Sequence, residues 1–146
     1  MTLLRFTVAA VFAATVLPAS ATQTQSLFER LGGLDAIECV VDEAIAIIVA
    51  DDRINAYFAG DLNEGQPQDL RDSLIDYFCS VTGGGCEYSG RDMVCAHAGL
   101  GIDNQAHNVF VEDLAEAAVD KCGADPAVYA EVSKFLLSLR PEVVQD

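Results

Sequence analysis

The chain has 146 residues, with 23 acidic and 8 basic side chains and a formal net charge of −15. This length suits a single domain with one hydrophobic core. Surfaces that bind nucleic acid or anionic membranes need clustered Lys and Arg, whereas the basic residues here are few and scattered. The composition therefore excludes nucleic acid as a partner and favours a solvated, acidic surface.

Residues 1–21 have the pattern of a secretory signal peptide. Arg5 precedes an apolar run over residues 6–17, and a short stretch of small residues ends at Ala21. We expect cleavage after Ala21, export to the periplasm or the medium, and a mature domain over residues 22–146. The apolar run is shorter than the roughly 20 residues that span a bilayer, and an uncleaved anchor is the alternative.

An apolar stripe predicts a helix over residues 35–50. Its members recur at helical spacing, which marks one buried face; they are Ile37, Val40, Val41, Ala44, Ile45 and Ile48. Asp35, followed by Glu38 three residues later, predicts a capping box at the start of this helix.

A second stripe predicts a helix that begins near Pro67, because proline is favoured in a first helical turn, and ends at the glycines of residues 83–85. Its apolar members are Leu70, Leu74, Tyr77, Phe78 and Val81.

Two more helices are expected towards the C-terminus. One covers residues 104–121 with Asp103 or Asn104 as its cap, and the last starts with Asp125 as cap and stops at Pro141. Shorter segments connect these helices at residues 26–31, 52–58 and 91–97. No alternating strand pattern is present in the sequence, so the predicted fold class is all-α.

The chain contains five cysteines, an odd number. They are Cys39, Cys79, Cys86, Cys95 and Cys122. In an exported protein some of them should pair and at least one thiol should remain. We expect a disulfide within the cluster formed by Cys79, Cys86 and Cys95, because the triple glycine lets the chain fold back. No zinc-site spacing is present.

Four segments together resemble the group I truncated haemoglobins. They read SLFERLGGLDAI, ADDRINAYFAG, TGGGCEYSGRDM and AHAGLGI, in this order, and the resemblance extends from residue 26 to about residue 144. It implies a two-over-two helical sandwich around haem b, with His97 as the proximal ligand of the iron. A neutral imidazole is a good iron ligand, and the absence of a CxxCH motif indicates that the haem is not covalently attached.

The resemblance also implies roles for other cofactor-binding residues. Phe58 would pack on the haem face, Met93 and Ile102 would contact the proximal side, and Tyr88 or Arg91 would approach a propionate. The helix covering the distal side of the iron would contribute Leu70, Leu74, Tyr77 and Phe78. For each apolar residue, plain core packing is the alternative interpretation.

The sequence departs from the family in the distal pocket. Ala44 and Ile45 replace the phenylalanine and tyrosine that the family places there, and Leu74 replaces a glutamine. Without a donor, bound oxygen loses a stabilising hydrogen bond worth about 1 to 3 kcal/mol, although Tyr77 could supply one from a rotated helix. We therefore expect weak oxygen retention and little effect on carbon monoxide.

The two remaining unusual residues lie near the proximal site. His107 stands one position beyond the family's histidine, and we expect a surface or propionate-facing role rather than iron ligation. Cys95 lies two residues before His97, so it should face another direction and be a small buried apolar residue.

The leading functional hypothesis is a haem protein that binds a diatomic gas, of the oxygen-carrier type, with oxygen, carbon monoxide or nitric oxide as ligand. Alternatives are a haem- and thiol-based gas or redox sensor, an enzyme that converts nitric oxide or peroxide, and a domain that has lost haem. An enzyme is disfavoured because such chemistry generally uses a distal acid–base group. The reductase partner and the oligomeric state do not follow from the sequence.

Overall fold

The computed structural model describes residues 24–60 and 67–145. The predicted signal peptide, with its cleavage site after Ala21, lies outside the described residues. Within the described part of the chain all regular secondary structure is helical, which confirms the predicted all-α class.

The first two helices meet at a double glycine. α1 (Leu27–Leu31) begins with a capping box formed by Ser26 and Glu29, and α2 (Leu34–Ala50) follows directly. Gly32 and Gly33 have φ angles of 108° and 79°, a left-handed conformation that favours glycine and reverses the chain within two residues. The capping box predicted at Asp35 is wrong, because α2 begins one residue earlier and places Asp35 inside its first turn.

The remaining elements are η1 (Asn55–Phe58), α4 (Pro67–Thr82), α5 (Met93–His97), α6 (Asn104–Ala115), η2 (Glu116–Lys121), α7 (Pro126–Ser138) and α8 (Arg140–Val143). The predicted caps Asp103 and Asp125 are confirmed, since their side chains accept from the amides of Ala106 and Ala127.

Two predicted boundaries need correction. The helix expected over residues 104–121 changes after Ala115 into a π-helical segment, η2. Pro141 does not terminate α7. It lies in the first turn of α8, where a missing backbone N–H breaks no helical hydrogen bond.

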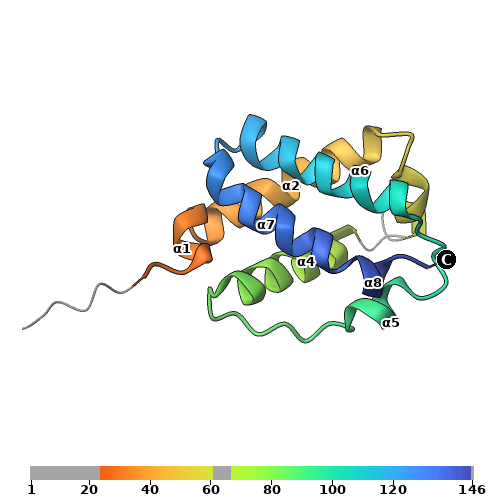
Figure 1. Cartoon of the computed structure of the whole chain (residues 1–146), viewed down its shortest axis with the longest axis horizontal. Coiled ribbons are helices and arrows are strands. Elements are labelled where there is room, and N and C mark those ends of the chain that lie inside the picture. The colour runs from red at the N-terminus through yellow and green to blue at the C-terminus, as the bar shows by residue number, and fades with distance from the viewer. Residues whose placement is uncertain (1–23, 61–66, 146) are drawn as a thin grey trace, which may run out of the picture.

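The long helices form the body of the molecule (Figure 1). α2 packs against α4, η2 and α6, while α6 packs against α7. The short helices α5 and α8 lie together at the end where the chain finishes. Val41 of α2 is 1% exposed and Ile54, before η1, is also 1% exposed. Burying a side chain of this size contributes about 1.5 to 3 kcal/mol.

Two disulfides cross-link this body. Cys79 at the end of α4 pairs with Cys86, which confirms a disulfide within the predicted cluster. Cys39 of α2 pairs with Cys122 at the end of η2, a bond that joins residues 83 positions apart. Cys95 is free and exposed, so the expectation that it is buried is wrong.

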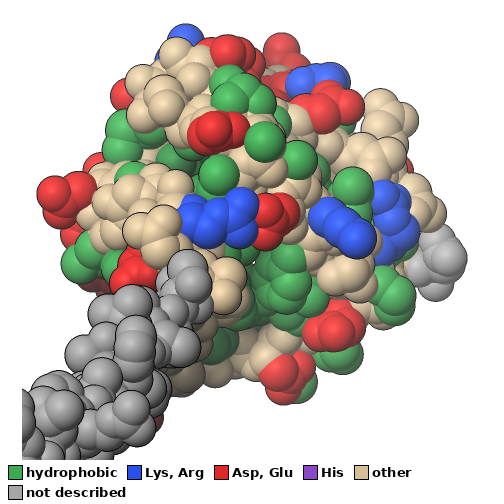
Figure 2. Space-filling model, turned by 60° about the vertical axis from the view of Figure 1, so that its left-hand side comes forward, with side chains coloured by type: hydrophobic (Ala, Val, Ile, Leu, Met, Phe, Trp, Pro, Cys, Tyr) green, Lys and Arg blue, Asp and Glu red, His purple; other side chains and the backbone are tan. Residues whose placement is uncertain are grey.

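On the face shown in Figure 2, acidic side chains are scattered among hydrophobic ones, and several Lys and Arg side chains lie across its middle. The described residues contain no helix that is long and apolar enough to cross a membrane.

Candidate functional site

A cavity of about 520 Å³ lies at the end of the molecule occupied by α5 and α8, a volume typical of small-molecule and cofactor sites. Every site residue predicted from the sequence lines it: Phe58, Leu70, Leu74, Tyr77, Phe78, Tyr88, Arg91, Met93, His97 and Ile102. The structure therefore brings together residues that are spread over forty-five positions of sequence.

The cavity has two walls that come from different parts of the fold. α4 provides one wall, and its backbone packs on α1 and α2 without approaching α5, α6 or α8 among the described residues. The opposite wall is formed by α5, α6 and α8, which are joined because α8 packs on both α5 and α6. We call these the α4 wall and the α5–α6–α8 wall.

His97 ends α5 on the α5–α6–α8 wall. Asp92 caps this five-residue helix by accepting from the amide of Cys95 at 2.9 Å. The Nδ1 of His97 lies 2.7 Å from the carbonyl oxygen of Met93, so Nδ1 carries the proton of the neutral ring. Nε2 is then left with a free lone pair, which is the arrangement that metal-ligating histidines require.

Gln145, near the C-terminus, holds the segment that follows His97. Its side-chain Nε2 donates to the carbonyl of His97 at 2.6 Å, and its Oε1 accepts from the amide of Gly99 at 3.0 Å. Its backbone N–H donates to the carbonyl of Ile102 at 2.9 Å. Sequence reasoning missed this residue, because it lies beyond the last helix and in no motif.

Polar groups gather along the non-helical segment before α5. The ring of Tyr88 packs edge-on against Tyr77 with centroids 5.2 Å apart, and its hydroxyl donates to the carbonyl of Arg91 at 2.8 Å. Gly90 lies so close to the Tyr88 ring that a Cβ would overlap it. The exposed Arg91 makes no salt bridge with any described residue, so its guanidinium is available to an anion.

The α4 wall is apolar where Leu70 and Leu74 face the cavity, as predicted from the sequence. Ile45 does not line the cavity; it packs against the core beside the buried face of α2. Two hydroxyl-bearing residues that the sequence analysis missed, Tyr57 and Ser73, do line it. Burial raises the pKa of Tyr77, which keeps its hydroxyl protonated at neutral pH.

His107 is 4% exposed and lines the cavity from α6. Of the two positions expected for it, the surface one is therefore wrong, and the propionate-facing one stays a prediction. The reason for its burial is helical geometry: residues 107, 110 and 114 share the inward face of α6. Its Nδ1 is buried without a hydrogen-bond partner. Burial, with smaller contributions from Arg140 and His97, lowers the pKa of His107, so the ring is neutral at pH 7.

Cys95 is exposed and does not line the cavity. A hydrogen bond and the charge of Asp92 raise the pKa of this thiol. A raised pKa disfavours the reactive thiolate at neutral pH.

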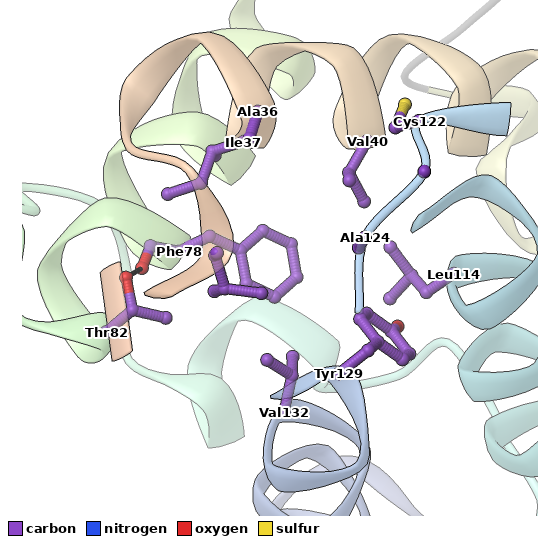
Figure 3. A pocket seen from close by; sticks show the side chains of 12 residues that line it. Ala36, Ile37, Val40, Phe78, Thr82, Leu114, Cys122, Ala124, Tyr129 and Val132 are labelled. Carbon is purple, nitrogen blue, oxygen red and sulfur yellow. Dashed lines mark hydrogen bonds between the residues drawn. The ribbon is translucent and has the colours of Figure 1, made fainter. Parts of the chain in front are cut away.

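A second, smaller cavity of about 90 Å³ adjoins the first, because Phe78 lines both. Figure 3 shows Ile37 and Val40 of α2 around it, with Tyr129 and Val132 of α7 on the opposite side. The described residues that line it are largely apolar and offer no cluster of polar groups that could bind or transform a ligand.

Comparisons with known proteins point to one family. The model of the family described as bacterial-like globin matches residues 26–143. A group 1 truncated haemoglobin of Tetrahymena thermophila is 29% identical over 117 residues, covering 80% of this chain and 93% of that protein. The group 1 truncated haemoglobin GlbN of Synechocystis sp. is 30% identical over 112 residues, covering 74% and 86%.

The fold agrees with these sequence matches. The crystal structure of the truncated haemoglobin of Tetrahymena pyriformis in its Fe(III) form superposes with a TM-score of 0.75 at 25% identity. The match covers 84% of this chain and 100% of that structure. The predicted truncated-globin fold is thereby confirmed.

Proposed function

Because the chain belongs to the bacterial-like globin family, whose cofactor is haem with its iron, we propose that His97 binds the iron of a haem b in the 520 Å³ cavity and that a diatomic gas binds opposite. The observation that carries this proposal is the 2.7 Å contact between Nδ1 of His97 and the carbonyl oxygen of Met93. This contact leaves Nε2 of His97 free to act as an axial ligand.

The chemistry of the cavity fits a haem. Leu70, Leu74 and Ile102 provide apolar surfaces for the macrocycle, and small residues such as Ala96 leave room beside His97. Tyr88 and the unpaired Arg91 lie where they can meet the propionates, since a guanidinium recognises carboxylates well. The bound haem would supply an iron that takes up small gases, and the protein would hold it and exclude water.

The α4 wall bears on the choice of gas. Leu70 and Leu74 offer no hydrogen-bond donor, which favours carbon monoxide and nitric oxide over tightly held oxygen. Tyr57, Ser73 and Tyr77 also line the cavity and carry hydroxyls. The oxygen dissociation rate therefore decides between an apolar pocket and one with a hydroxyl donor.

We also propose that the protein is exported and loses residues 1–21. The disulfides Cys39–Cys122 and Cys79–Cys86 support this, because such bonds persist mainly in oxidising compartments. Mass spectrometry of the protein from its native source should find Thr22 at the N-terminus. A protein that begins at Met1 in its final compartment would contradict export with cleavage.

The ligand assignment is tested by removing histidines one at a time, since the chain has only two. We expect the reconstituted protein and His107→Phe to give the same histidine-ligated spectra in the ferric, ferrous and carbon monoxide forms. In His97→Gly/His107→Phe, which has no histidine left, these spectra should be lost. An unchanged Soret band in the double variant would refute the assignment of His97.

A further inference from the structure

We propose that His107 is a reserve iron ligand, which binds the haem iron when the bond to His97 is broken. The inference rests on the proposed function, because it requires a haem in the cavity. It goes beyond that function by giving the protein two imidazoles for a single axial position.

Both histidines belong to the same wall. His97 ends α5 and His107 lies in the first turns of α6, and α8 packs against both helices. α4, which carries Leu70 and Leu74, lies across the cavity. A haem held between the two walls would therefore have both imidazoles on its α5–α6–α8 side.

The surroundings of His107 suit a ligand more than a propionate partner. The other residues of α6, α7 and α8 that line the cavity are apolar: Ala106, Phe110, Leu136, Leu139 and Val143. Arg91, the cation suited to a propionate, lies in the segment before α5 instead. A propionate would thus find its partners elsewhere, and the apolar part of the cavity is where the body of a haem would lie.

No side-chain hydrogen bond from a described residue fixes the ring of His107, although the backbone of Leu136 lies beside it. Its Nδ1 is enclosed by protein and makes no hydrogen bond, although the side chain as a whole lines the cavity. Nε2 is therefore the nitrogen that can meet a bound group. The side chain is 4% exposed and lines the cavity, so a group bound in the cavity is the partner that Nε2 can reach.

The exchange needs no other reactant. The bond between the iron and Nε2 of His97 would break and a bond would form between the iron and the lone pair of Nε2 of His107, with the proton of the neutral His107 ring on Nδ1. No proton or electron is transferred. A second imidazole would retain the haem whenever the first bond breaks.

The test compares three reconstituted variants: His97→Gly, His107→Phe and His97→Gly/His107→Phe. Phenylalanine fills the space of the imidazole and cannot bind iron. We expect His97→Gly alone to keep a histidine-type ferrous carbon monoxide spectrum and an iron–histidine stretch in resonance Raman. The double variant should lose both, and its affinity for haem b should fall at least tenfold below that of His97→Gly.

Free imidazole provides the control for folding. Added to the double variant, it should enter the cavity and restore the histidine-type spectrum. If His97→Gly and the double variant give the same spectrum and bind haem equally, or if neither binds, His107 is not a reserve ligand. That result would leave the proposed function intact as long as His107→Phe retains the spectrum of the unaltered protein.

Discussion

Replacing Gln145 with alanine should loosen the segment that carries His97 and accelerate loss of haem. The change removes the bond from Nε2 to the carbonyl of His97 at 2.6 Å and the bond from the amide of Gly99 to Oε1 at 3.0 Å. The side chain also approaches the amide of Gly101, but at 3.4 Å this contact adds little. The backbone bond to Ile102 does not depend on the side chain.

Each of the two lost bonds contributes about 0.5 to 1.5 kcal/mol. They act on the haem through the position of His97, so we expect about 1 to 2 kcal/mol to appear in haem binding, or a roughly five- to thirtyfold faster release. The assay is haem transfer to an excess of an apo-globin acceptor. Gln105→Ala, at an exposed position of α6 where no side-chain hydrogen bond is lost, is the matched control. Equal release rates for Gln145→Ala and the control would refute the reasoning.

Three further predictions concern the gas, the disulfides and acid. Leu74→Gln should slow oxygen release by roughly ten- to hundredfold, because the glutamine adds a hydrogen-bond donor worth about 1 to 3 kcal/mol. Flash photolysis measures the rate, with Leu74→Met as the control. Equal rates in the two variants would show that residue 74 does not face the ligand. Replacing Cys39 and Cys122 by serines should lower the free energy of unfolding by about 4 to 5 kcal/mol, and replacing Cys79 and Cys86 should lower it by about 2 to 3 kcal/mol. The two costs differ because the bonds close loops of 83 and 7 residues. Urea unfolding without reductant measures both, and equal costs would contradict the prediction. Burial raises the pKa of Asp113 to about 6. A raised folded-state pKa adds stability that is fully present below the unfolded value and lost as pH rises through 6. From pH 5 to 7.5 the protein should therefore lose about 1.4 kcal/mol relative to Asp113→Asn. Parallel pH profiles in urea unfolding would exclude a buried, proton-binding Asp113.

The long helices could be predicted from the sequence because their signals are local. The caps at Asp103 and Asp125 and the glycines after α4 act within one turn of the helix they bound. The residues predicted from the family resemblance also line one cavity. His97 could be identified because it lies within a short sequence motif, AHAGLGI. Such local signals do not depend on tertiary contacts, so they can be recognised in the sequence alone.

The errors concern how a helix is rotated and what covers it. Ile45 belongs to the apolar stripe of α2, but it is only partly buried, whereas Val41 and Ala44 are fully buried. This difference is set by the packing of α2 against α4, η2 and α6, which the sequence does not show. His107 is a polar residue on the apolar face of α6, so hydrophobicity alone does not predict that it is buried. The position of Cys95 on the outer side of α5 depends on α8, an element that the sequence analysis did not predict.

The dependence of α5 on α8 follows from the size of α5. Helices shorter than about 12 residues are marginal in water, and α5 has 5 residues. Its cap at Asp92 and the ring of His97 bonded to Met93 stabilise it internally, but neither fixes its position in the molecule. That position comes from α8 and Gln145, over forty residues further along the chain. The proposed iron ligand is thus oriented by the C-terminal end of the fold, and a change there acts on the haem without touching it.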